Sequence, residues 1–314
     1  MRSDRIDVSG HTRVKVDNTA GEVSVVTHDQ PFVDIEIDAR DEDLVEGTEI
    51  LSSSDGAVTE VSVIVPKPRR LNFGHKMDVS VTVRMPARGD LSVRSVSADV
   101  EAAGVYGDVD VHTVSGDTTV DDAASARVRA VSGDCSFGSI LQSLEIVSVS
   151  GDVEAGYVGG RLHASSTSGD LSIGVLGQAG ETESVSGDVR IEVVHDGVTM
   201  KTVSGDLRAG CIAAGDVRAN SLSGDIVLGV APNRLLHVEA RSKSGSMSSD
   251  IPLGDAPPEA GVPSPAGDAA ADEALVASPV DIRAESLSGD IRIVRAPEPA
   301  PRTNGFAGAL QSQQ

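Results

Sequence analysis

A tripeptide, Ser-Gly-Asp, recurs along this sequence and brings a carboxylate with it each time. Its aspartates are Asp117, Asp134, Asp152, Asp170, Asp188, Asp206, Asp225 and Asp290. Carboxylate oxygens are ligands that Ca²⁺ prefers, so the row contains candidate metal ligands, namely Asp134, Asp152, Asp170, Asp188 and Asp206. Ca²⁺ takes about six to eight oxygens, and one carboxylate per repeat supplies few of them. The spacing also differs from that of calcium-binding nonapeptide repeats.

A turn explains the same tripeptide better than a metal site does. Ser and Asp side chains accept backbone N–H bonds in tight turns, and Gly adopts the positive φ that such turns need. We therefore predict a structural turn, with the calcium site as the alternative. The predicted turn residues are Gly116, Asp117, Gly133, Asp134, Gly151, Asp152, Gly169, Asp170, Gly187, Asp188, Gly205, Asp206, Gly224, Asp225, Gly289 and Asp290.

No other group of residues has the spacing of a catalytic or cofactor site. The 7 histidines are scattered, and the sequence has neither a Gly-x-Ser-x-Gly elbow nor a phosphate-binding Gly-rich loop. Aromatic residues make up 2% of the chain, which leaves few platforms for sugar binding. We predict that the protein is not an enzyme and uses no cofactor.

The segments that carry the motif repeat about every 18 residues. From Asp99, in the degenerate copy Ser97-Ala98-Asp99, to Asp225 the successive spacings are 18, 17, 18, 18, 18, 18 and 19 residues. Around each aspartate, apolar and polar residues alternate, as in Val153-Glu154-Ala155, which is typical of a strand with one buried face. A pair of such strands cannot bury its apolar face alone, but stacked coils can. The predicted fold is an all-β β-solenoid, either two-sided or three-sided.

One apolar column does not fit this alternation easily. The residue three places before each aspartate is Val or Leu almost throughout: Val96, Val114, Val131, Val149, Val185, Val203, Leu222 and Leu287, with Thr167 as the exception. Strict alternation would turn this column outward, and a kink at the preceding small residue would turn it inward. Because an outward column would be a long exposed apolar patch, we expect it to face inward.

The regularity of the pattern divides the chain into five parts. Residues 96–251 form the repeat array, and residues 1–95 are predicted to form a β-rich N-terminal cap with the first irregular coils. Residues 252–280, rich in Pro, Ala and acidic residues, are predicted to be a flexible insertion. Residues 281–294 form a final coil that docks back on the stack, and residues 295–314 form a disordered tail. Cys135 and Cys211 lie four coils apart, about 19 Å, so both are predicted to be free thiols.

Charge and hydropathy limit the possible partners and location. The formal net charge of −22 repels phosphate backbones, which excludes nucleic acid as the expected partner. No apolar run is long enough for a membrane span, and the N-terminal residues have no secretory signal pattern. We expect a cytoplasmic protein.

The Ser-Gly-Asp-Val-x-Val repeats, with Val65-Pro66 and Met85-Pro86 at two strand ends, resemble the bacterial "putative adhesin" or toastrack family of β-solenoid domains. The resemblance covers residues 5–294. It implies an interaction or scaffolding module, in relatives often coupled to membrane-embedded envelope-stress components. The family has no agreed catalytic residues, so none is carried over.

The sequence thus favours a non-catalytic scaffold that presents a long acidic face to a protein partner of unknown identity. Two alternatives stay open, a glycan-binding or polysaccharide-active β-helix protein and a surface adhesin. Fold alone does not separate them.

Overall fold

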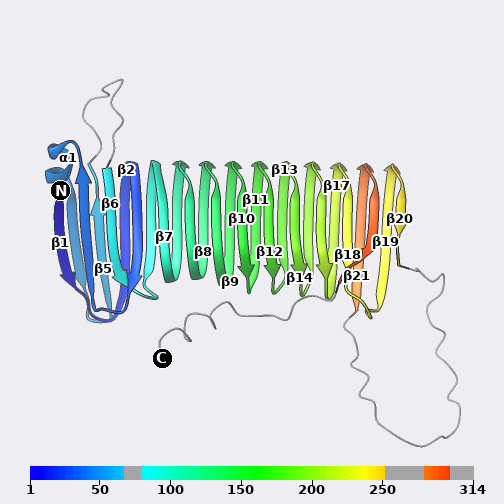
Figure 1. Cartoon of the computed structure of the whole chain (residues 1–314), viewed down its shortest axis with the longest axis horizontal. Coiled ribbons are helices and arrows are strands. Elements are labelled where there is room, and N and C mark those ends of the chain that lie inside the picture. The colour runs from blue at the N-terminus through cyan, green and yellow to red at the C-terminus, as the bar shows by residue number, and fades with distance from the viewer. Residues whose placement is uncertain (67–78, 252–278, 298–314) are drawn as a thin grey trace, which may run out of the picture.

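Alternating apolar and polar residues form strands along almost the whole described chain. The computed structural model of the protein describes residues 1–66, 79–251 and 279–297. In these residues 22 strands form a single sheet, which winds into an elongated β-solenoid, and one short helix lies near its N-terminal end (Figure 1). The predicted fold class is confirmed.

The elements follow one another in two regions. The N-terminal region contains β1 (Arg2–Asp7), β2 (His11–His28), β3 (Phe32–Ala39), α1 (Glu42–Gly47), β4 (Glu49–Ser54), β5 (Val58–Ile64) and β6 (Val79–Pro86). The coils contain β7 (Asp90–Ser115), β8 (Thr118–Ser132), β9 (Cys135–Ser150), β10 (Val153–Val158), β11 (Arg161–Ser168), β12 (Leu171–Leu176), β13 (Gly180–Ser186), β14 (Val189–Val194), β15 (Val198–Ser204), β16 (Leu207–Ile212), β17 (Gly215–Ser223), β18 (Ile226–Val230), β19 (Leu236–Ser244), β20 (Met247–Ser249), β21 (Val280–Ser288) and β22 (Ile291–Arg295). Among the described residues, no helix is long and apolar enough to cross a membrane.

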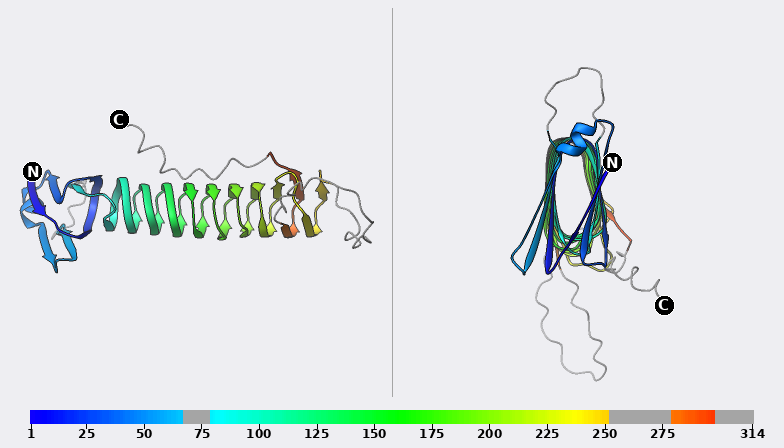
Figure 2. Two further views of the ribbon diagram at one scale, coloured as in Figure 1. Left: turned by 90° about the horizontal axis from the view of Figure 1, so that it is seen from below. Right: turned by 90° about the vertical axis from the view of Figure 1, so that its left-hand side faces the viewer.

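The solenoid is two-sided. One stack of parallel strands contains β10, β12, β14 and β16, and the other contains β11, β13, β15 and β17. Equivalent residues of successive coils pair with each other, as Val153, Leu171 and Val189 do, and their side chains are buried between the stacks. Figure 2 shows the flattened cross-section that results. The coil therefore has two sides and not three, a choice that the sequence left open.

The N-terminal end is closed by strands of opposite direction. The first coil is β2, which pairs in parallel with β7 on one side and with β5 and β6 on the other. Its Glu22 aligns with Asp99, so it holds the aspartate position of a coil. Beyond β5 and β6, the antiparallel strands β3 and β4 continue the sheet, and β1 pairs with β3.

The last coil in the sequence is not the last coil in space. Strand β21 lies between β17 and β19, and β22 lies between β18 and β20 (Figure 1). The coil of residues 280–295 is therefore inserted into the stack, and the earlier coil of β19 and β20 forms its end. The predicted insertion over 252–280 falls outside the described residues except for its last two, and the predicted tail falls outside them from residue 298 onward.

The column three residues before each aspartate faces solvent, so the expectation that it faces inward is wrong. Val96, Val114, Val131, Val149, Val185, Val203, Leu222 and Leu287 are 43–50% exposed. Strict alternation persists to the end of each strand, and the preceding residue, such as Ser148 or Thr202, is buried in its place. These buried positions hold only small residues, namely Ser, Thr or Ala.

Candidate functional site

The Ser-Gly-Asp turns stack in register along one narrow edge of the solenoid. Their glycines, from Gly116 to Gly289, have φ angles between 114° and 150°, a region that L side chains rarely adopt. The backbones also approach closely, since a Cβ built on Gly187 would lie 2.2 Å from the carbonyl oxygen of Gly169. Two independent constraints therefore require glycine at this position of the coil.

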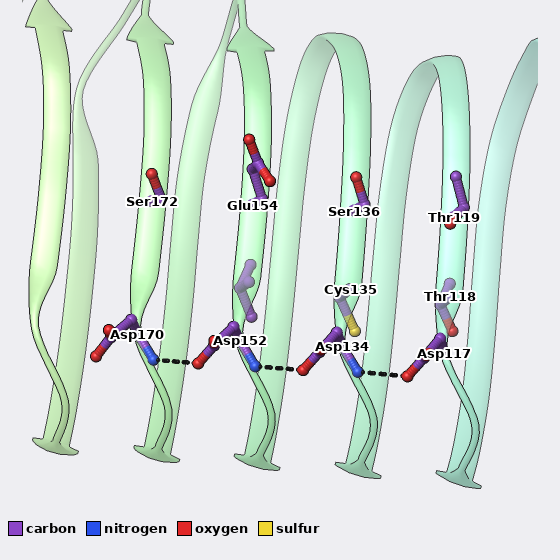
Figure 3. Close-up of a pocket in the computed structure, with 11 residues that line it drawn as sticks. Asp117, Thr118, Thr119, Asp134, Cys135, Ser136, Asp152, Glu154, Asp170 and Ser172 are labelled. Atoms are coloured by element: carbon purple, nitrogen blue, oxygen red, sulfur yellow. Dashed lines mark hydrogen bonds between the residues drawn. The ribbon is translucent and has the colours of Figure 1, made fainter.

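The aspartates form a hydrogen-bonded ladder between coils. The Oδ1 of Asp117 accepts the backbone N–H of Asp134 at 2.9 Å, and the Oδ1 of Asp134 accepts that of Asp152 at 2.8 Å (Figure 3). The same bond joins every neighbouring pair from Asp99 to Asp290, at 2.8–3.0 Å. The sequence predicts carboxylates that accept bonds within their own turn, but in the structure each carboxylate accepts its bond from the next coil.

Each aspartate also bonds through its main chain. The carbonyl oxygen of Asp170, for example, accepts the N–H of Val153 in the preceding coil at 2.9 Å. Asp170 is thus fixed to the coil before it through N–H and C=O, and to the coil after it through its carboxylate. The row of carboxylates therefore links successive coils along the edge of the stack.

A shallow groove runs beside this ladder and is the candidate site for a ligand. It has a volume of about 500 Å³ and is lined by Asp117, Thr118, Thr119, Asp134, Cys135, Ser136, Asp152, Val153, Glu154, Asp170 and Ser172 (Figure 3). Within residues 1–66, 79–251 and 279–297, no three His, Cys, Asp or Glu side chains are grouped as a metal site requires. Binding of Ca²⁺ by Asp134, Asp152, Asp170, Asp188 and Asp206 stays a hypothesis.

Cys135 reaches the groove but has a buried thiol. Burial, followed by the nearby carboxylates of Asp134 and Asp117, raises its pKa to about 11. Burial also raises the pKa of Cys211. Both cysteines are free, as predicted from their separation along the stack.

These pKa shifts predict slow thiol chemistry in the folded protein. With a pKa of about 11, only about one Cys135 thiol in a thousand is ionised at pH 8, and the thiolate is the reactive form. We expect iodoacetamide to label Cys135 far more slowly in the native protein than in urea, as peptide mass spectrometry can measure. Rapid native labelling at pH 8 would contradict the buried position.

The column that was expected to face inward forms a row on the surface, which we call the apolar stripe. It consists of Val96, Val114, Val131, Val149, Val185, Val203, Leu222 and Leu287. The flanking pairs Ser184–Thr202 and Ser186–Ser204 place Val185 beside Val203, and other coils repeat this register. With coils about 4.8 Å apart, the stripe is about 38 Å long. Strict alternation was the signal that could have identified it.

Comparison with known proteins agrees with this architecture. The model of the Toastrack family DUF4097 matches residues 34–213 and 181–293. No curated protein matches the sequence. Similar solved structures include a "putative adhesin" from Bacteroides fragilis, 12% identical over 94% of this chain and 96% of the other, with a TM-score of 0.36. Another "putative adhesin", from Parabacteroides distasonis, is 12% identical over 93% and 96%, with a TM-score of 0.33.

A "putative cell adhesion protein" from Clostridium sporogenes is 9% identical over 94% of this chain and 99% of the other, with a TM-score of 0.28. The family match spans the whole repeat array and the N-terminal region from residue 34 onward. The chain belongs to the Toastrack family DUF4097.

Proposed function

We propose that the protein is a non-catalytic scaffold that binds a protein partner along the apolar stripe. The observation that carries this proposal is the stripe itself, eight aliphatic side chains about half exposed on a rigid surface. Thr167 interrupts the row between Val149 and Val185, but soluble proteins rarely expose so many aliphatic side chains in one row unless the row contacts something.

The surroundings of the stripe limit the chemistry of the partner. The aspartate ladder runs along the same edge of the solenoid, because each aspartate follows three residues after Val149 or its equivalent. The chain as a whole carries a net charge of −22. A partner must therefore bury aliphatic side chains while it brings neutral or basic groups to the carboxylates. Nucleic acid does not meet this condition, because its phosphates repel the surface.

We also propose a cellular location and a process. The two unpaired thiols suit a reducing compartment, in keeping with the cytoplasmic location expected from the sequence. The family resemblance further suggests a partner among the membrane-associated components of envelope-stress signalling. Fractionation of the native host would place the protein inside the cell or on its surface, and a surface location would favour the adhesin alternative.

Three conservative substitutions test the stripe. Val114→Thr, Val131→Thr and Val149→Thr keep the β-branched shape, so the fold should be retained, but each removes about one buried methyl group from the interface. At roughly 0.8 kcal/mol each, the triple variant should bind its partner about 50-fold more weakly. Co-purification from the native host with quantitative mass spectrometry identifies the partner, and binding to the purified partner gives the affinity.

The matched control changes three outward residues on the other stack that lie outside the groove, Arg190→Gln, Glu192→Gln and Arg208→Gln. It should bind as the unmodified protein does. Equal losses of affinity in the two triple variants, or none in the stripe variant, would contradict binding along the stripe.

A further inference from the structure

Within the part of the chain that the structure describes, nothing covers the end of the solenoid formed by β19 and β20, which we call the open end. The inward-facing Leu236, Val238 and Ala240 are only partly buried, whereas Ile282 and Ala284 in the neighbouring coil are fully buried. Among the described strands, β19 pairs with β21 alone, so its other edge has no strand beside it. An uncovered core layer next to a free strand edge favours the addition of another strand.

The coil at this end differs in charge from the rest of the chain. Residues 235–249 contain one acidic residue, Glu239, and two basic residues, Arg241 and Lys243, although the chain as a whole carries −22. The aspartate position is taken by Ser246, whose backbone N–H donates to the Oδ1 of Asp290 at 2.8 Å. The open end is thus the place where two copies of this acidic chain would repel each other least.

We propose that the protein forms a two-fold symmetric dimer in which β19 pairs antiparallel with β19 of a second copy. A two-fold axis normal to the sheet through the middle of β19 keeps the buried faces of both copies on the same side. Leu236, Val238 and Ala240 of the two chains then close one continuous core. The dimer has twice the length of one solenoid.

Charge complementarity selects the same arrangement. Ala240 is the central residue of the nine-residue strand, so full overlap centres the pairing on it. Glu239 then lies opposite Arg241 of the second copy, and Arg241 lies opposite Glu239 of the second copy. A shift of the centre to residue 239 or 241 would place Glu against Glu or Arg against Arg. The longest overlap is therefore also the register that pairs opposite charges.

Both residues are available for such contacts. Glu239 and Arg241 are exposed, and their ion pairs with Arg283 and Glu285 on β21 have N–O distances of 3.7 Å. Exposed pairs of this kind contribute little to folding, so their substitution should leave the coil intact. The inference does not depend on the function proposed for the apolar stripe, which lies along the side of the solenoid.

Sedimentation of the full chain tests the mass, and X-ray scattering tests the length. We expect a particle of twice 32.2 kDa whose greatest dimension is about double that of the monomer. Arg241→Glu creates two Glu–Glu contacts and Glu239→Arg creates two Arg–Arg contacts, so each variant alone should dimerise at least about tenfold more weakly. Mixed together, they restore both opposite-charge pairs and should form a heterodimer about as stable as the unmodified dimer.

Circular dichroism of each variant checks that the fold is retained, and the recovery on mixing excludes misfolding as the cause of dissociation. A monomer at about 100 μM would overturn the proposal, as would a dimer that neither substitution weakens. A monomer with slow amide exchange in β19 would show instead that residues 252–278 or another part of the same chain covers the edge. Single variants that fail to associate on mixing would also overturn it.

Discussion

Gly187→Ala is expected to destabilise the solenoid by about 2–5 kcal/mol, measured by urea unfolding followed with circular dichroism. Gly187 has a φ of 143°, and forcing an L residue into the left-handed region costs about 1–2 kcal/mol. The new Cβ would also meet the carbonyl oxygen of Gly169 at 2.2 Å, so the two coils must separate or tilt. Overpacking of this kind costs about a further 1–3 kcal/mol. Gly187→Val adds β-branching and should be worse.

The matched control is Gly56→Ala. Gly56 also has a positive φ, 87°, but a Cβ there would have no atom within 4 Å. Only the conformational cost remains, about 1–2 kcal/mol. Equal destabilisation by the two substitutions would mean that backbone conformation, and not the close approach of the coils, explains the glycine column.

The stacking of the coils could be predicted from sequence because two signals agree. The period of about 18 residues and the alternation in Val153-Glu154-Ala155 together require strands that bury one face and repeat. The structure pairs Val153 with Leu171 and Leu171 with Val189 in that register. Local pattern and global fold are consistent here, which is why the all-β solenoid was predicted correctly.

The position of the last coil could not be predicted, because the coils resemble one another. Ile282 of β21 pairs with Val217 on one side and with Val238 on the other, and each is an aliphatic residue at the same point of its coil. Repeats with equivalent contact surfaces stack in any order that the connections permit. The sequence predicts that residues 281–294 form a coil, but it does not predict that the coil is inserted beside β17.

The predicted orientation of the stripe was wrong because two rules gave opposite orientations for its side chains. Alternation turned Val149 outward, and the rule against exposed apolar patches turned it inward. Alternation prevailed, and the buried position is taken by the preceding small residue, Ser148. Apolar residues that a fold leaves exposed are expected at functional surfaces. The interaction proposed for the stripe rests on this expectation.

The hydrogen bonds of the aspartate ladder could not be predicted from the sequence either, because they join residues of different coils. Spacing identified Asp152 and Asp170 as turn residues, but only stacking shows that the first carboxylate accepts the N–H of the second at 2.9 Å. The geometry changes what substitution should do. Loss of a side-chain acceptor weakens the contact between coils and not the turn alone.

A triple Asn variant, Asp152→Asn with Asp170→Asn and Asp188→Asn, should retain its stability. The amide oxygen of Asn can accept the same N–H of the next coil that each Asp Oδ1 accepts at 2.8–2.9 Å. Charges about 4.8 Å apart in water repel by on the order of 1 kcal/mol, so their removal offsets the loss of the stronger charged acceptor. The matching triple Ala variant removes three acceptors and should lose about 3 kcal/mol in urea unfolding.

The same variants decide whether the column binds Ca²⁺. If its carboxylates act only as acceptors for neighbouring coils, millimolar Ca²⁺ should leave the melting temperature of the unmodified protein unchanged, and the Asn variant should behave alike. A metal that binds the folded state alone would raise the melting temperature by mass action. A rise of several degrees with Ca²⁺ but not with Mg²⁺, abolished by the three Asn substitutions, would show that the ladder is a calcium site. Equal stability of the Asn and Ala variants would show instead that the carboxylate bonds contribute nothing to the stack, because only the Ala variant lacks an acceptor at each step.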